Sequence, residues 1–115
     1  PQESPPAFDL ILLGMGEDGH TASLFPGTAW DEEKWVVANY VPKLRANRIT
    51  MTPRLLNAAR KIVFLTSGAA KAPALASVLQ NPLTDYPAKR IQPATGDLTW
   101  MVDKAAATLL DRELL

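Results

Sequence analysis

Cysteine is absent from the 115-residue sequence, and histidine occurs only once. The lack of cysteine excludes disulfide bonds, thiolate metal sites and a cysteine nucleophile, and it agrees with a cytoplasmic location. With a single histidine, a zinc site would need carboxylates for nearly all of its ligands, so we expect no metal centre.

Net charge and long apolar runs are also absent. The 12 basic and 12 acidic residues cancel, so no global charge attracts nucleic acid or an anionic membrane. No apolar run approaches the roughly 18 residues that a membrane span needs, and no secretory signal opens the chain. The hydrophobic share of 47% and the charged share of 21% are those of a folded chain. We therefore expect one domain over residues 1–115, with no nucleic-acid or membrane partner.

Ten prolines divide the chain into short elements. After an extended lead-in over residues 1–7, the apolar run at 8–13 predicts a strand that is buried on both faces. A short helix is expected over 21–25. Further strands are expected at 35–41, 48–52, 62–66 and 98–102.

Helix signals separate several of these strands. Thr52 is a cap for a helix that starts at Pro53, Asn81 ends a second helix, and Asp103 is a cap for the last one. The residues predicted to face the core from these helices are Leu55, Leu56 and Ala59, then Ala72, Leu75, Ala76 and Leu79, then Ala105, Ala106, Leu109 and Leu110. Strands that alternate with helices predict an α/β layer structure with a largely parallel sheet.

The turn that follows the first predicted strand carries the densest chemical signal. Gly14, Gly16 and Gly19 allow the backbone to turn sharply and to approach a ligand closely. The only histidine, His20, follows Asp18 by two residues in this turn. An imidazole moves protons near neutral pH, and a neighbouring carboxylate can orient it. The alternative is a tight turn with an ordinary surface histidine.

The same glycines match the G-x-G-x-x-G pattern of dinucleotide-binding turns. We reject this interpretation because that motif needs a long helix after the third glycine, whereas Pro26 and Gly27 would end a helix after about two turns. The strand that follows offers Asn39, rather than an acidic residue, near its end.

Two cations stand near the starts of predicted elements. Arg48 opens the strand at 48–52, and Lys71 lies near the amino end of the second helix. A lysine there conflicts with the helix dipole unless an anion is bound, and a phosphate would remove the conflict. The alternative for both residues is an ordinary solvated side chain.

The segment from Gly14 to Gly27 reads GMGEDGHTASLFPG and resembles the 6-phosphogluconolactonase family. Three later segments fit the resemblance in the same order: RITMT at 48–52, SGAAKA at 67–72, and WMVD at 100–103 with Ala105 and Ala106. The related glucosamine-6-phosphate deaminases share the Gly-x-Gly-x-Asp-Gly-His core. They continue with an asparagine–glutamate pair where Leu24 and Phe25 stand here, so the lactonase is favoured.

The resemblance implies a role for each matching residue. His20 would be the general base that activates water against a lactone carbonyl, and Asp18 would orient it. Arg48 and Lys71 would bind the phosphate of a small sugar-phosphate lactone. Gly14, Gly16 and Gly19 would approach the substrate, and backbone amides of this loop would stabilise the oxyanion. No metal or organic cofactor is implied.

The resemblance covers only the C-terminal half of the longer family enzyme. It implies a Rossmann-like three-layer fold of the lactonase and deaminase type, of which residues 1–115 form the C-terminal portion. A Gly-Ser phosphate loop and another arginine belong to the half that is not matched. The unfinished sheet edge and apolar surface favour pairing with another copy. A deaminase or isomerase, and a non-catalytic fragment that binds an anion or a partner, remain as alternatives.

Overall fold

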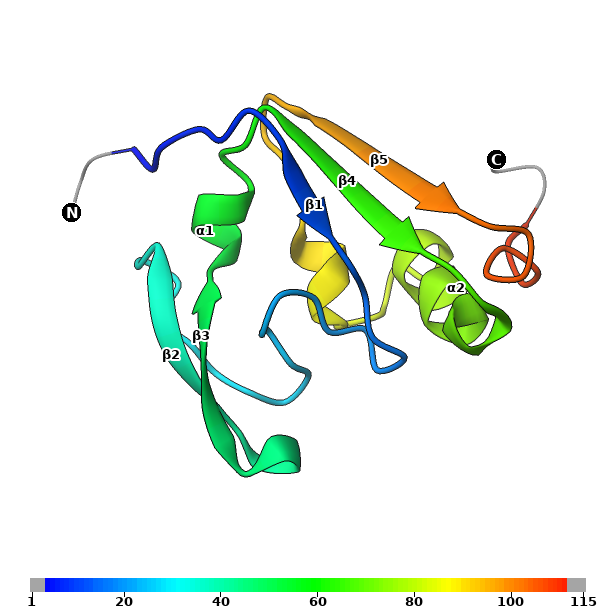
Figure 1. The fold of residues 1–115 in the computed structure, drawn as a ribbon, viewed down its shortest axis with the longest axis horizontal. Coiled ribbons are helices and arrows are strands. Elements are labelled where there is room, and N and C mark those ends of the chain that lie inside the picture. Colours follow the sequence, from blue (N-terminus) through cyan, green and yellow to red (C-terminus); the bar gives the residue numbers. More distant parts are fainter. Residues whose placement is uncertain (1–3, 112–115) are drawn as a thin grey trace.

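A computed structural model of the chain describes residues 4–111 (Figure 1). Its strands are β1 (Ile11–Leu13), β2 (Val36–Val41), β3 (Ala46–Met51), β4 (Lys61–Thr66) and β5 (Asp97–Val102). Its α-helices are α1 (Pro53–Leu56) and α2 (Ala72–Gln80), and short 3-10 helices lie at η1 (Pro42–Leu44), η2 (Ala69–Lys71) and η3 (Pro87–Arg90). Residues 4–7 of the predicted lead-in carry no helix or strand, and residues 1–3 lie outside the described part.

The main sheet has three parallel strands in the order β1-β4-β5. Phe64 on the central strand β4 pairs with Leu13 on one side and with Trp100 on the other. The rings of Phe64 and Trp100 stack with their centroids 3.9 Å apart. This arrangement confirms the predicted α/β fold with a parallel sheet.

Strands β2 and β3 form a separate antiparallel hairpin rather than part of the main sheet. Its register runs from Val36 opposite Met51 to Val41 opposite Ala46. The helix η1 forms the tip, and Arg45 closes it in a left-handed conformation with φ of 50°. In Figure 1 this hairpin extends away from the sheet, on the opposite side from α2.

The hydrophobic core lies on one face of the sheet. Side chains from alternate positions of β1 and β4 point toward α2, where Leu75 is fully buried. The buried cluster includes Ile11, Leu13, Met15, Leu24, Leu56, Ile62, Phe64, Leu75, Val78, Ile91, Ala106 and Leu110. The loop after β1 contributes Met15 and Leu24, so the core anchors it.

The opposite face of the sheet is largely exposed, although Val63 near its centre is buried. This corrects the prediction of a first strand buried on both faces. Leu12 is 60% exposed, Leu65 on β4 is 50% exposed, and Met101 on β5 is 57% exposed. The register and the two-residue repeat of the strands place these three side chains on the same face. The cause is that helix residues pack on the other face, where Leu75 and Val78 of α2 and Leu56 of α1 join the buried cluster.

The segment at 21–25 is not the short helix that its sequence predicts. It is a tight turn in which Thr21 and Leu24 form an isolated antiparallel bridge. Ala22 has φ of 49°, which is incompatible with a right-handed helix. Local helix propensity is overridden here because Thr21 Oγ1 donates a 2.7 Å hydrogen bond to the Gly14 carbonyl.

The other helix predictions are partly right. Thr52 accepts a hydrogen bond from the Leu55 amide and Pro53 opens α1, as predicted. Leu79 of α2 is exposed, and Val78 takes its place in the core. After β5 the chain makes turns rather than a regular helix up to residue 111, although Asp103 accepts from the Ala106 amide as a cap. Residues 112–115 lie outside the described part.

Among residues 4–111, no helix has the length and apolar composition that are needed to cross a membrane.

Candidate active site

The glycine-rich loop begins where β1 ends, at the carboxyl edge of the parallel sheet. The amide of Gly16 donates to the His20 carbonyl at 2.9 Å, and the amide of Gly19 donates to the Gly16 carbonyl at 3.0 Å. Gly19 has φ of 80°, and a Cβ there would lie 2.3 Å from the ring of Tyr86. This position therefore requires glycine on both conformational and steric grounds.

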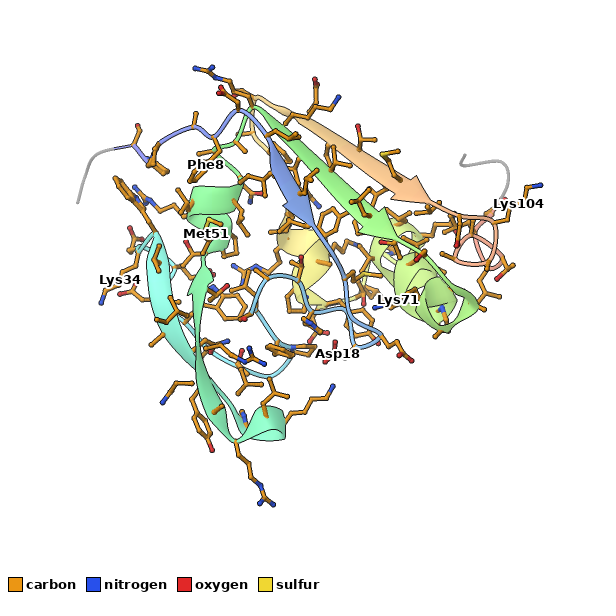
Figure 2. All side chains as sticks on the ribbon, viewed as in Figure 1. Phe8, Asp18, Lys34, Met51, Lys71 and Lys104 are labelled. Atoms are coloured by element: carbon orange, nitrogen blue, oxygen red, sulfur yellow. The ribbon has the colours of Figure 1, made fainter. Side chains whose placement is uncertain are left out.

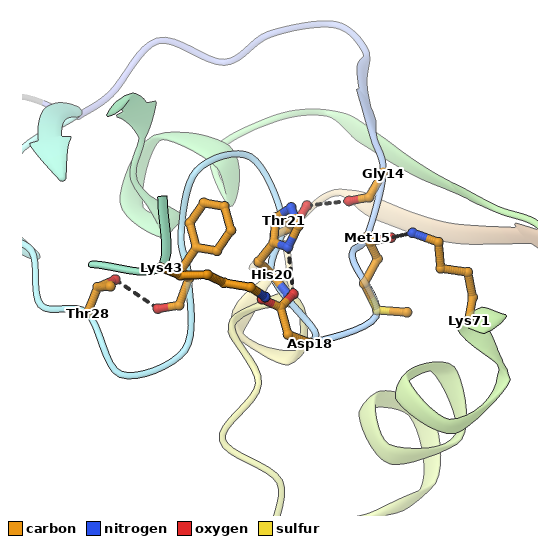
Figure 3. Close-up of polar contacts among 9 residues, drawn as sticks. Gly14, Met15, Asp18, His20, Thr21, Thr28, Lys43 and Lys71 are labelled. Carbon is orange, nitrogen blue, oxygen red and sulfur yellow. Dashed lines mark hydrogen bonds and ion pairs between the residues drawn. The ribbon is translucent and has the colours of Figure 1, made fainter. Parts of the chain in front are cut away.

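His20 and Asp18 form the central polar contact of the loop (Figure 3). Nδ1 of His20 lies 2.6 Å from Oδ1 of Asp18, and the same oxygen accepts from the His20 backbone amide at 3.2 Å. A carboxylate oxygen can only accept, so neutral His20 carries its proton on Nδ1. This tautomer leaves the lone pair on Nε2, so this nitrogen can act as a base and take a proton from a ligand.

The ring of His20 is also held from the side by Phe25. The two rings stack with their centroids 4.2 Å apart and their planes inclined by 18°. Phe25 is buried, so it provides a rigid surface on which the imidazole rests. The hydrogen bond to Asp18 and this stack together restrict the orientation of the ring.

Lys43 completes the polar cluster from the tip of the β2–β3 hairpin. Its Nζ donates to Oδ2 of Asp18 at 2.8 Å. Partial burial disfavours the charged form of Asp18, but the hydrogen bonds from Lys43 and His20 outweigh it. They hold the pKa of the Asp18 carboxyl well below its usual range. Asp18 is therefore ionised at neutral pH.

The hairpin is fastened to the loop by contacts around Ser23. Asn39 on β2 donates to the Ser23 carbonyl at 2.8 Å, and Thr50 on β3 accepts from the Ser23 amide at 3.0 Å. Both Asn39 and Thr50 are buried. These two contacts position the hairpin against the loop that carries His20.

Lys71 approaches the glycine loop from the start of α2. Its Nζ donates to the Met15 carbonyl at 2.5 Å (Figure 3). The ammonium group has three donors, so this bond leaves capacity for a ligand. Lys71 lies next to the end of β1 through this contact, although it is 56 residues away from Met15 in the sequence.

A hollow of about 390 Å³ brings several of these residues together. The residues that line it are Leu12, Leu13, Gly14, Met15, Gly16, His20, Ala22 and Lys71. It lies where ligands bind in open parallel sheets, beyond the carboxyl end of a strand. The arrangement places a proton acceptor and a cation around one open space, which suits hydrolysis of an anionic substrate.

The chain matches a known protein family over most of its length. The family described as "Glucosamine-6-phosphate isomerases/6-phosphogluconolactonase" matches residues 1–100. The chain belongs to this family.

Known relatives agree with the family assignment. The 6-phosphogluconolactonase of Rattus norvegicus is 41% identical over 111 residues, and that of Homo sapiens is 44% identical over 115 residues. Each match covers 94% of this chain and 43% of the relative. The chain thus spans less than half the length of these relatives.

Solved structures show the same relationship. The devB protein superposes with a TM-score of 0.86 at 38% identity, over 96% of this chain and 48% of that one. A 6-phosphogluconolactonase from Leishmania guyanensis gives 0.81 at 31% identity, over 96% and 45%. A monomeric glucosamine-6-phosphate deaminase gives 0.69 at 29% identity, over 88% and 47%. The fold is therefore the Rossmann-like architecture that lactonases and deaminases of this family share.

Most residues that the sequence singled out meet at the hollow. Gly14, Gly16, His20 and Lys71 line it, and Asp18 touches it through His20. Gly19 belongs to the same loop but packs against Tyr86 and does not line the hollow.

Arg48 is not among the residues that line the hollow. It is exposed on β3, opposite Asn39 in the hairpin register. It shares the hairpin face of Asn39 and Thr50, which is the face that contacts the loop. The phosphate-binding role of Arg48 stays a prediction.

Two residues of the cluster were not predicted from the sequence as functional. Lys43 lies in an ordinary hairpin turn with no motif around it, so no local signal pointed to it. Phe25 belongs to the glycine-loop segment, but only the tertiary structure shows that it stacks on His20. Within residues 4–111, no group of three or more His, Cys, Asp or Glu side chains is arranged to hold a metal ion.

Proposed function

We propose that this chain carries the proton-transfer centre of a 6-phosphogluconolactonase, which hydrolyses 6-phospho-D-glucono-1,5-lactone to 6-phosphogluconate in the pentose phosphate pathway. The observation that carries the proposal is the 2.6 Å contact between His20 and Asp18 at the wall of the hollow. The names of the relatives from rat and human support the choice of reaction.

The proposed reaction begins with a water molecule between His20 and the lactone. Nε2 of His20 removes a proton from the water as its oxygen bonds to the carbonyl carbon. The carbonyl becomes a tetrahedral oxyanion. The oxyanion then collapses, the bond from this carbon to the ring oxygen breaks, and the imidazolium returns the proton to the leaving oxygen. The products are a carboxylic acid and a free hydroxyl, with no proton gained or lost by the enzyme.

Asp18 supports this proton transfer in two ways. Its carboxylate fixes the Nδ1–H tautomer, which keeps the basic nitrogen available to the water. Its negative charge then stabilises the imidazolium that forms during the attack. Phe25 limits rotation of the ring while the charge develops.

Binding of the substrate is assigned to the cations near the loop. Lys71 lines the same hollow as His20, which supports its role as a phosphate ligand. Gly14 supports a close approach of the substrate, because no atom lies within 4 Å of the place where its Cβ would be. Arg48 is proposed as a second phosphate ligand on the strength of the family resemblance.

The oxyanion is assigned to backbone amides of the glycine loop. The amides of Gly16 and Gly19 already donate hydrogen bonds to carbonyls of the loop, so in this conformation neither is available to an oxyanion. The proposal therefore rests on other amides of the segment 14–19.

A deaminase or isomerase is the second candidate, because one matching structure is a glucosamine-6-phosphate deaminase. Leu24 and Phe25 argue against it, since they fill the core where the deaminase sequence has an asparagine and a glutamate. A non-catalytic fragment that binds an anion is the third candidate. Turnover of the lactone, turnover of glucosamine 6-phosphate, and binding without turnover separate the three.

The remaining proposals concern the surroundings of the protein. The exposed sheet face of Leu12, Leu65 and Met101 supports self-association of this chain, as does the open edge of β1. We also propose that residues 1–115 are one domain that forms the C-terminal portion of a larger lactonase unit. A cytoplasmic location stays a prediction.

The test uses the chain and a chimera, in which the part of the human relative that this chain does not cover is placed before Pro1. Lactone hydrolysis is measured after subtraction of the spontaneous reaction. In the chimera, His20→Ala and His20→Gln should each lower turnover by about 10²–10⁴-fold, with a smaller effect on substrate binding. Activity within a few-fold of the unsubstituted chimera in both variants would remove His20 from the mechanism.

A further inference from the structure

The Asp18 carboxylate is shared by two partners from different parts of the chain. Oδ1 accepts both hydrogen bonds from His20, and Oδ2 accepts the hydrogen bond from Lys43. Because each oxygen has its own donor, rotation of the carboxylate breaks contacts on both sides. The contact with Lys43 therefore restricts the same carboxylate that orients the imidazole.

Lys43 reaches Asp18 because the hairpin tip is fixed in place. It lies in η1, between the paired strands β2 and β3, and Arg45 closes this turn. Asn39 and Thr50 hold the hairpin to the loop at Ser23. The Lys43 side chain is 65% exposed, yet the backbone that carries it is anchored at both strands.

We propose that Lys43 is a positioning residue for His20, which holds the Asp18 carboxylate in register with the imidazole and favours the neutral, basic form of the ring through its positive charge. This inference rests on the proposed role of His20 as the base. A cation bonded to the far oxygen of Asp18 offsets part of the attraction between this carboxylate and an imidazolium. Removal of this cation therefore strengthens the attraction between Asp18 and an imidazolium.

Other charged groups also lie around His20, and the effect of each on the imidazole must be distinguished from the effect of Lys43. Glu17 is exposed on the same loop, and Lys71 lines the hollow. Arg48 is exposed on the hairpin face that meets the loop. The element packed directly on the ring is uncharged Phe25. Among the described residues, Lys43 is the cation that forms an ion pair with Asp18, so its removal changes that pair and leaves the other charges in place.

The experiment uses the single histidine of the chain as its own probe. The imidazole of His20 is titrated by NMR in the full 115-residue chain, and ¹⁵N spectra report which ring nitrogen carries the proton. The variants are Lys43→Met, Lys43→Arg and the matched control Lys34→Met. Lys34 lies just before β2, near the end of the hairpin opposite η1 and away from Asp18 (Figure 2).

We expect the titration midpoint of the His20 imidazole to move to higher pH by about half a pH unit in Lys43→Met. The reason is that this variant loses one partly solvated cation near the ring. Lys43→Arg should restore the original midpoint, and Lys34→Met should leave it unchanged. In the chimera, Lys43→Met should move the acid limb of the pH–rate profile by the same amount, with KM for the lactone within about twofold.

An unchanged midpoint in Lys43→Met, or a shift to lower pH, would overturn the inference. So would an equal shift in Lys34→Met. The NMR result does not depend on turnover. A chimera without lactonase activity but with the expected midpoint shifts would therefore reject the proposed function and keep the coupling between Lys43, Asp18 and His20.

Discussion

A Cβ atom on Gly16 would lie 2.1 Å from Nδ1 of His20 and 2.8 Å from Oδ1 of Asp18. Because Gly16 has no side chain, the hydrogen bond between His20 and Asp18 can occupy the space that a Cβ would fill. Glycine is needed here for close approach, and not for a left-handed backbone, because the positive φ values belong to other glycines of the chain.

Gly16→Ala should therefore displace His20 rather than unfold the chain, since the atoms in conflict belong to side chains. We expect the His20 ring signals to lose the ring-current shift from Phe25, and turnover of the chimera to fall by about 10²-fold. Gly14→Ala is the control for the His20 ring spectrum only, because its Cβ meets no other atom of the chain within 4 Å. A His20 spectrum in Gly16→Ala that matches the unsubstituted chain would contradict this account.

The depressed pKa of Asp18 predicts how stability depends on pH. A carboxyl with a lower pKa in the folded chain than the usual value of about 3.9 stabilises the fold above about pH 4. This contribution is lost as the pH falls toward the folded value. Asp18→Asn should lower the melting temperature by roughly 4 °C at pH 7, and the difference should shrink steadily below about pH 4.

Asp9→Asn is the control for this experiment. Asp9 also forms an ion pair, with Arg60 at 2.8 Å, but both side chains are largely exposed. We expect its melting temperature within about 2 °C of the unsubstituted chain at every pH, because exposed pairs contribute little. A difference between Asp18→Asn and the unsubstituted chain that stays constant from pH 7 to pH 2.5 would argue against the ion pair as its cause.

Removal of the charge at Lys71 or Arg48 should weaken binding of a phosphorylated ligand selectively. We expect Lys71→Met and Arg48→Met in the chimera to reduce affinity for 6-phosphogluconate by about tenfold or more, because a charged hydrogen bond to phosphate is lost. Affinity for gluconate should change much less, and Lys34→Met should affect neither. Calorimetry with both ligands measures the difference, and equal losses for the two would exclude a phosphate role.

The 115-residue chain alone should be a poor lactonase in comparison with the chimera. The phosphate must hold the lactone carbonyl next to the water on His20, and such positioning can contribute several kcal/mol to lowering the barrier. Lys71 and Arg48 are the part of this phosphate site that we propose the chain supplies. Turnover by the chain at a rate comparable to the chimera would show that the cations and loop present here suffice.

The open sheet face should drive association of the isolated chain. Sedimentation experiments should show concentration-dependent dimers or larger species, which Leu65→Glu reduces by placing a charge on this face. Leu83→Glu is the matched control, because Leu83 is 90% exposed in the loop after α2. A monomer at all concentrations, or equal effects of both substitutions, would show that the face of Leu12, Leu65 and Met101 does not mediate association.

Local sequence patterns determined much of the fold and part of the candidate site. The β-branched and aromatic residues of β4 and the Thr52–Pro53 cap act over a few neighbouring positions, so they could be interpreted directly. The spacing of Asp18 and His20 within one glycine loop likewise made their contact predictable, because a tight turn keeps side chains two residues apart close together.

Tertiary structure decided what depends on distant partners. Thr21 turns toward the Gly14 carbonyl instead of starting a helix, because a buried hydroxyl must find an acceptor. Leu12 is 60% exposed because no helix or strand of the described chain packs over it, although its neighbour Val63 on the same face is buried. Lys43 meets Asp18 across 25 positions of sequence only because a separate hairpin docks on the loop, and no local pattern encodes the relative placement of two such elements.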